Sequence, residues 1–129
     1  MKFSIAVFGA PYSSQASLSA LRFGNAVITS GHELFRVFFY HEGVMSGNSL
    51  VVPPQDELNL HEGWRDFAIR SDTELVVCIA SALRRGLLDK TEAKRYEKDA
   101  VSLDPGFVIA GLGQLIDAGL QSDRLVTFN

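Results

Sequence analysis

The single cysteine of the chain, Cys78, is the side chain whose type and position are best suited to chemistry. It follows the apolar run 75–77, which is rich in β-branched residues and predicts a buried central strand. The residues after it favour a helix that ends at Gly86. In open parallel sheets, binding and catalysis take place just beyond the carboxyl ends of the strands. The sequence therefore predicts a reactive cysteine at a strand end, at least partly reachable from solvent or from a partner groove.

The thiolate is the nucleophilic form of cysteine, and nearby cations or the N-terminus of a helix favour it. Arg84 and Arg85 lie within two helical turns of Cys78, although the sequence leaves their direction open. The competing interpretation is structural, because free cysteine is among the most buried residue types and often acts as a small hydrophobic residue. With Val77 and Ile79 on either side, Cys78 could equally belong to the core.

Two histidine–glutamate pairs, His41–Glu42 and His61–Glu62, are further candidates for acid–base chemistry or metal binding. Neither pair has a second partner at metal-ligand spacing, so we interpret both as exposed loop residues. The turn at residues 9–14 lacks the glycine spacing of a dinucleotide fingerprint and the Gly-Lys-Ser/Thr of a phosphate loop. We therefore expect neither a metal nor a cofactor.

Several short motifs together resemble the DsrE/TusD family of sulfur-relay proteins, over nearly the whole chain and in order. They are Gly9-Ala-Pro-Tyr12 with Gln15, Gly31-His-Glu-Leu-Phe-Arg-Val-Phe-Phe-Tyr-His-Glu-Gly-Val44, Val77-Cys78-Ile-Ala-Ser-Ala-Leu-Arg-Arg-Gly86, Gly111-Leu-Gly-Gln-Leu115 and Asp123-Arg-Leu-Val126. A run of matches of this kind is much more specific than a lone cysteine.

The resemblance implies a flavodoxin-like, DsrEFH-like sheet and a sulfurtransferase subunit in which Cys78 carries sulfur as a persulfide. It implies a heterohexamer with two paralogous subunits, and small sulfur-carrier proteins as donor and acceptor. In TusD-like members the relay serves 2-thiolation of the tRNA wobble uridine, which is the role we favour here. In DsrE-like members it serves dissimilatory sulfur oxidation.

Two other functions remain open at this point. One is a noncatalytic assembly subunit of the same type of complex, with Cys78 buried. The other is a cysteine hydrolase, which needs a histidine and an Asn or Asp converging on the sulfur. Accessibility of the thiol separates the first from sulfur transfer, and a histidine within hydrogen-bond distance of the sulfur would support the second.

Composition limits the class of protein. The 129 residues suit a single domain, 1–129, with 47% apolar and 21% charged residues. A net charge of −3 without a basic stripe argues against direct nucleic-acid binding. No apolar run approaches the roughly 20 residues that cross a membrane. One cysteine excludes an internal disulfide and fits a reducing compartment, so we expect a cytoplasmic protein.

Apolar periodicity and turn residues predict strands that alternate with helices. Strands are expected at 3–8, 33–40, 75–77 and 124–128, and helices after Ser13 or Ser14, from Asp56 to Ile69 with Trp64 in the core, and from Asp89 to Lys98. Residues 104–120 allow either a helix from Asp104-Pro105 or a strand at 107–110 followed by a helix at 112–120. Right-handed crossovers then give a three-layer α/β domain, with a mostly parallel sheet of four or five strands and helices on both faces.

Two further expectations concern loops. The loop at 44–55 has apolar residues that would either cover the strand ends or bind a partner subunit, so we expect the chain to self-associate or to join relatives. Gly106, Gly111 and Gly113 are too irregular for a phosphate-binding motif, and we expect them to pack closely against the strand end at Cys78.

Overall fold

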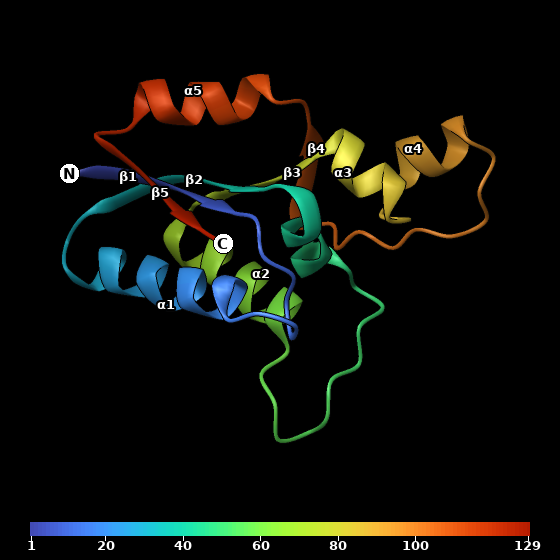
Figure 1. Cartoon of the computed structure of the whole chain (residues 1–129), viewed down its shortest axis with the longest axis horizontal. Helices are drawn as coiled ribbons and strands as arrows, with labels where there is room; N and C mark the ends of the chain where they lie inside the picture. The colour runs from blue at the N-terminus through green and yellow to red at the C-terminus, as the bar shows by residue number, and fades with distance from the viewer.

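The computed structural model describes residues 1 to 129 and contains one sheet of five parallel strands (Figure 1). The strands are β1 (Lys2–Val7), β2 (Glu33–Phe39), β3 (Glu74–Cys78), β4 (Phe107–Ala110) and β5 (Arg124–Phe128). They lie in the order β4-β3-β2-β1-β5. The predicted three-layer α/β architecture is confirmed, but β2 is the central strand, and β3 lies one place from the edge.

Helices cover both faces of the sheet because the chain reverses direction once. From β1 to β4, each right-handed crossover moves the chain one place in the same direction, which puts α1 (Ala16–Thr29) and α2 (Leu60–Ser71) on one face. The chain then returns over the opposite face through α5 (Gly113–Gln121) and places β5 beside β1 (Figure 1). None of the helices has both the length and the apolar character needed to span a bilayer.

Three short helices lie beyond the carboxyl ends of the strands. They are the 3-10 helix η1 (His41–Gly47), which follows β2, and the helices α3 (Ile79–Arg84) and α4 (Lys90–Arg95), which connect β3 to β4. Figure 1 shows α3 and α4 reaching past the strand ends, away from the layers formed by α1, α2 and α5. This is the end of the sheet at which parallel α/β proteins bind their ligands.

The core between the sheet and α2 is built around Trp64, as the sequence predicted. Its fully buried ring packs edge-on against Phe39, with ring centroids 5.2 Å apart, and against Phe67, at 5.9 Å. The indole Nε1 donates a hydrogen bond of 3.0 Å to Ser17 Oγ of α1. The buried polar group is thus satisfied, and the contact joins both helices of this face to the sheet.

A buried cation holds α5 on the other face. Arg36 of β2 donates from Nε to Glu74 Oε2 (2.6 Å) and from Nη1 to Asp117 Oδ2 (2.8 Å) and the Gln114 carbonyl (2.9 Å). Burial lowers the pKa of Arg36, but the hydrogen bonds and charges of Glu74 and Asp117 outweigh it, so this pKa is raised overall. The network therefore keeps Arg36 charged and ties α5 to β2 and β3.

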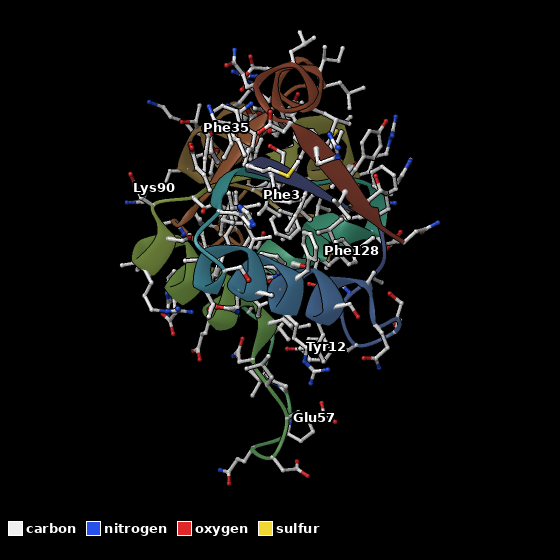
Figure 2. All side chains as sticks on the ribbon, turned by 90° about the vertical axis from the view of Figure 1, so that its left-hand side faces the viewer. Phe3, Tyr12, Phe35, Glu57, Lys90 and Phe128 are labelled. Carbon is white, nitrogen blue, oxygen red and sulfur yellow. The ribbon has the colours of Figure 1, made fainter.

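Helix α2 begins later than the sequence predicted. Asn59, not Asp56, is the capping residue, and its Oδ1 accepts a 3.4 Å hydrogen bond from the Glu62 backbone N–H. Both residue types cap helices, so composition alone did not separate them. Asp56 lies instead in the loop at 48–59, which projects from the body of the protein; Glu57 marks this projection in Figure 2.

The boundaries of the elements after Cys78 confirm some of the sequence predictions and correct others. The predicted cap at Asp89 is confirmed, since its Oδ1 accepts from the Glu92 N–H at 2.8 Å, but α4 ends at Arg95 rather than near Lys98. Of the two alternatives for 104–120, the strand followed by a helix is the one found. Asp104 forms a turn in which its carbonyl oxygen accepts from the Phe107 N–H at 3.0 Å.

Candidate functional site

Cys78 is the last residue of β3 and the N-cap residue of α3. Its backbone is extended, with φ −63° and ψ 124°, and it lies opposite Ala110, the last residue of β4. The chain turns from strand to helix immediately after the sulfur-bearing residue. The predicted position at the carboxyl end of a buried strand is therefore confirmed.

The predicted accessibility of Cys78 is wrong for this conformation. Only 3% of the residue is exposed, and it belongs to the hydrophobic core. Helices η1 and α3 pack against each other and against β3 at this strand end, with Val44 and Ala82 fully buried. The apolar residues that flank Cys78 had left this outcome open. A reagent reaches the sulfur only after some part of this cover has moved.

Two polar contacts join η1 to α3 over this region. The His41 backbone N–H donates to Ser81 Oγ at 3.1 Å. Arg85 donates to Glu42 Oε1 from both Nε (2.9 Å) and Nη2 (2.8 Å), across the surface of the protein. The hydrogen bond from Arg85 lowers the pKa of the Glu42 carboxyl, and attraction to the guanidinium charge adds to this. Glu42 is thus a carboxylate that holds α3 against η1.

The structure assigns different surroundings to the two arginines that follow Cys78. Arg85 turns back to Glu42 and to the Ser81 carbonyl oxygen, at 3.1 Å from Nη1. Arg84 is exposed and lines a surface groove. Neither guanidinium forms a hydrogen bond with the sulfur. The direction that the sequence left open is therefore outward for Arg84 and toward η1 for Arg85.

None of the three histidines is placed as a base for Cys78. His41 is exposed, and its ring lies against Tyr40, with centroids 4.0 Å apart. His32 contacts the N-terminal amine of Met1, at 3.0 Å from Nδ1. The hydrogen-bonded cysteine–histidine pair of a hydrolase is absent, and no three His, Cys, Asp or Glu side chains gather as a metal site would require.

His61 is a correction to the sequence interpretation, because it is not an exposed loop residue. It lies on the inner side of α2, only 8% exposed, with Nε2 at 3.7 Å from Asp104 Oδ2. Arg65 Nη1 also donates to Asp104 Oδ2, at 3.2 Å. Asp104 itself is buried, and it joins the turn before β4 to α2. The pair joins α2 to the turn before β4, and neither residue forms a hydrogen bond with Cys78.

The glycines after β4 also differ from expectation. A side chain added at Gly111 or Gly113 would meet nothing within 4 Å, so neither glycine packs closely against the Cys78 strand end. Gly106 approaches Arg65 and Asp104 instead. The close approach near this end of the sheet occurs at Gly43 of η1, where a Cβ atom would clash with the Val7 carbonyl oxygen. Helix η1 therefore packs closely against the end of β1.

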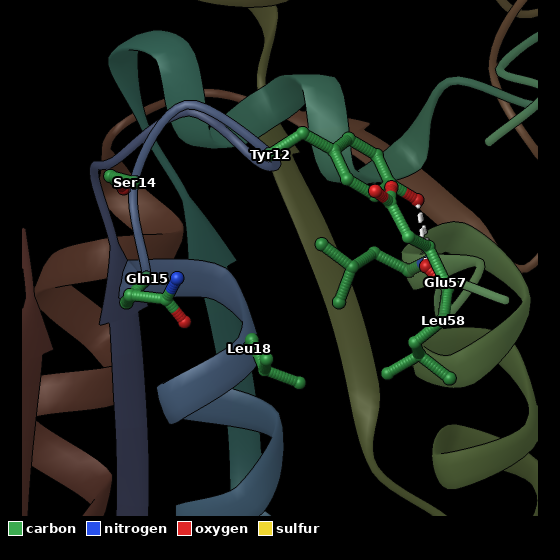
Figure 3. A pocket seen from close by; sticks show the side chains of 7 residues that line it. Tyr12, Ser14, Gln15, Leu18, Glu57 and Leu58 are labelled. Atoms are coloured by element: carbon green, nitrogen blue, oxygen red, sulfur yellow. Dashed lines mark hydrogen bonds between the residues drawn. The ribbon is translucent and has the colours of Figure 1, made fainter. Parts of the chain in front are cut away.

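The β1–α1 turn, which contains the Gly9–Tyr12 motif, contributes a second feature, whose contacts the sequence did not predict. Tyr12 OH donates to the Leu58 carbonyl oxygen at 3.1 Å and accepts from the Leu60 N–H at 3.0 Å (Figure 3). A small pocket of about 290 Å³ lies between this turn, Leu18 and the end of the loop. Tyr12 thus anchors the base of the projecting loop, while Leu50 and Val52 of that loop stay exposed.

Comparisons with known proteins agree with this geometry. The model of the DsrE/DsrF-like family matches residues 1–128. The DsrE protein of Allochromatium vinosum is 48% identical, with 99% of this chain and 98% of the relative covered. Sulfurtransferase TusD of Salmonella enteritidis is 44% identical, with 99% and 100% covered. The crystal structure of the ychN protein from E. coli is similar in fold, with a TM-score of 0.78, 23% identity and 99% of both chains covered.

Proposed function

The chain belongs to the DsrE/DsrF-like family, and we propose that it is a sulfurtransferase subunit in which Cys78 receives a persulfide sulfur and passes it to the next carrier. Sulfur transfer is the activity named for its full-length relatives. The observation that carries the proposal for this residue is the placement of the only cysteine at the carboxyl end of β3, where α3 begins. No second cysteine is present to receive the sulfur or to trap it as a disulfide.

The chemistry is an exchange without net oxidation or reduction. The Cys78 thiolate attacks the outer sulfur of a donor persulfide, the donor's S–S bond breaks, and the donor leaves as a thiolate. Cys78 then carries the persulfide. In the second step an acceptor thiolate attacks the outer sulfur of this persulfide, and the Cys78 thiolate is regenerated. Each step forms one S–S bond and breaks one.

The cover over Cys78 sets the condition for this exchange. Because the residue is almost completely buried, we place the reactive event in a conformation in which α3 has moved away from η1. The contacts that such a movement breaks are the His41–Ser81 hydrogen bond and the exposed Arg85–Glu42 pair. A surface ion pair contributes little in water, so contact with a partner protein could replace it at small cost.

The proposed partners are two paralogous subunits, with small sulfur-carrier proteins as donor and acceptor. The proposed destination of the sulfur is the 2-position of the tRNA wobble uridine. The alternative is DsrE-like transfer in dissimilatory sulfur oxidation, since relatives bearing either name match the whole chain. Loss of 2-thiouridine from bulk tRNA after deletion of the gene supports the first, and unchanged tRNA with impaired sulfur oxidation supports the second.

A noncatalytic assembly subunit is the second candidate, and the burial of Cys78 favours it. The two candidate functions can be distinguished by incubating the protein with a persulfide donor, alone and with its paralogues. Mass spectrometry of the intact protein then measures the sulfur gained. We expect the gain of one sulfur atom, removed by a reductant, and no gain in Cys78→Ser. Circular dichroism checks that the variant folds. If the wild-type protein gains no sulfur, either alone or with its paralogues, the assembly role is supported. If sulfur is still gained by Cys78→Ser, Cys78 is not the carrier.

A further inference from the structure

A groove of about 760 Å³ lies on the part of the molecule that continues from Cys78. Its apolar lining comes from α3 and the connection to α4, from the residues after α4 and from the base of the projecting loop, and includes Leu83, Leu88, Tyr96 and Leu50. Tyr96 and Leu50 are 52% and 65% exposed, respectively. Exposed large apolar side chains that converge on one hollow are typical of a binding surface rather than of a solvated one.

The charge around this groove has the opposite sign to that of the rest of the chain. Six of the twelve Lys and Arg residues fall within residues 84–99, together with four acidic residues, which gives this segment a net charge of +2. One of the four, Asp99, lines the groove beside Arg84 and Lys98. The remainder of the chain carries −5, because the whole chain carries −3. This asymmetry is hidden in the overall composition, where basic and acidic residues nearly balance.

The cations at the groove lack partners within the chain. Arg95 pairs with Glu92 and Arg85 with Glu42. By contrast, Arg84 and Lys98, which line the groove, have no carboxylate within 4.0 Å, and neither have Lys90 and Lys94 of α4. Unpaired cations beside an apolar hollow are suited to an occupant that carries both apolar and acidic side chains.

The groove is also close to the sulfur along the chain. Helix α3 starts at the residue after Cys78. Arg84 is six residues after Cys78, which corresponds to about 9 Å along a helix that rises 1.5 Å per residue. Helix α3 packs against β3 and η1 at the strand end where Cys78 lies. An occupant bound in the groove would therefore contact α3, the element whose proposed movement exposes the sulfur, and could bring its own sulfur to the same place.

We propose that the groove formed by α3, the connection between α3 and α4, residues 96–102 and Leu50 is the docking site for an acidic, apolar-anchored protein segment that exchanges sulfur with Cys78. This inference rests on the proposed function, because it names the surface that recognises the partner. The apolar lining favours a protein segment over RNA, since single-stranded nucleic acid needs several stacking aromatics, and Tyr96 is the one aromatic residue in the lining. Leu83 and Tyr96 provide the apolar anchor points, and Arg84 and Lys98 select for acidic flanks.

The test compares three persulfide donors at low salt. The first is the neutral persulfide of N-acetylcysteine amide, the second a leucine-containing cysteine peptide persulfide with four glutamates, and the third the same peptide with glutamines. Sulfur gained by Cys78 is followed by mass spectrometry. We expect the acidic peptide to load Cys78 about tenfold faster than the glutamine peptide, with the advantage falling as salt is added.

The double variant Arg84→Glu/Lys98→Glu should lose this advantage, measured as the ratio of the loading rates from the acidic and the glutamine peptide, so that any general change in Cys78 reactivity cancels. The matched control Arg22→Glu/Arg70→Glu changes two exposed cations on α1 and α2 and should keep the advantage. Tyr96→Ala should slow loading from both peptides, because it removes an apolar anchor that does not depend on charge.

The outcomes separate this inference from the proposed function. If the small donor loads Cys78 and the acidic peptide has no advantage, or the advantage survives the charge reversal, docking in the groove is wrong while sulfur transfer stands. If none of the donors loads Cys78, the proposed function itself fails, and the docking role fails with it. If a fluorescent single-stranded RNA binds wild-type protein tightly and the double variant weakly, the groove is a nucleic-acid site instead.

Discussion

The two crossovers on either side of β3 use similar lengths of chain for different purposes. Between β2 and β3, the chain forms α2, whose inner face buries Leu60, His61, Trp64 and Phe67 against the rest of the protein. Between β3 and β4, it forms α3 and α4, and every residue from 94 to 101 is exposed. Two crossovers that are equivalent in topology are therefore unequal in packing.

The difference separates a crossover that mainly stabilises the fold from one with an exposed surface that a partner could bind. Helix α2 lies flat on the sheet, and its aromatic contacts are part of the core. The segment from α3 to α4 instead extends past the strand ends, carries the excess positive charge, and begins at Cys78. The second crossover also contributes Ala82, Leu87 and Leu103 to the core, but residues 94–101 within it are all exposed, so we expect this part to change shape more easily when a partner binds.

The largest effect expected from this comparison concerns one aromatic residue in each crossover. Trp64→Ala should reduce the free energy of unfolding by about 3–5 kcal/mol, because it removes a fully buried ring and its contacts with Phe39 and Phe67. Tyr96→Ala should change it by no more than about 0.5 kcal/mol, because its ring is half exposed. Equilibrium unfolding in urea measures both. Similar losses in the two variants would show that the exposed residues 94–101 also support the core.

A smaller effect is expected at the contact between the crossovers. Asp104 is buried and accepts from Arg65 of α2 as well as from the Gly106 N–H, at 2.8 Å from Oδ1. Asp104→Asn keeps an oxygen for Gly106 but removes the charge that faces Arg65, and should cost about 1–3 kcal/mol of unfolding free energy.

The matched control is Asp66→Asn, which changes an exposed carboxylate 3.8 Å from the same arginine. Exposed ion pairs contribute little, so this variant should remain within about 0.5 kcal/mol of wild type. If Asp66→Asn proves as costly as Asp104→Asn, burial is not what makes the contact between the crossovers strong.

The smallest effect concerns the mobility of the second crossover. Glu42→Gln removes the charge that Arg85 contacts, so α3 should separate from η1 more often and iodoacetamide should alkylate Cys78 roughly two- to fivefold faster. Glu62→Gln, an exposed carboxylate on α2 without an ion pair, is the control and should leave the rate unchanged. Equal rates for all three proteins would show that the cover opens elsewhere.

The pH dependence of this contact follows from the lowered pKa of Glu42. A carboxyl whose pKa is lower in the folded state stabilises that state above the ordinary pKa of 4.5, and this contribution is lost as the pH falls through the lowered value. The ratio of alkylation rates between Glu42→Gln and wild type should therefore be constant from about pH 5 to pH 8. A ratio that changes across neutral pH would point to another titrating group.

Much of the fold could be predicted because the signals for it are local. The strand at 124–128 and the cap at Asp89 were predicted at the residues where they occur, since apolar runs and turn residues define them within a few positions. The start of α2 was missed because Asp56 and Asn59 are both good caps, and the choice depended on where Leu60 and Trp64 could reach the core. Local preference offered two answers, and packing selected one.

For the site, the sequence by itself determined that the only cysteine follows a buried strand and precedes a short helix, because both elements are defined by neighbouring residues. Only the tertiary structure decided that Cys78 is covered, that Arg85 faces Glu42, and that His61 is buried beside Asp104. Each of these depends on residues about 40 positions apart in the chain, which meet only when the sheet forms. The groove is of the same kind, because its walls come from three separate segments whose charges and apolar side chains converge only in the folded protein.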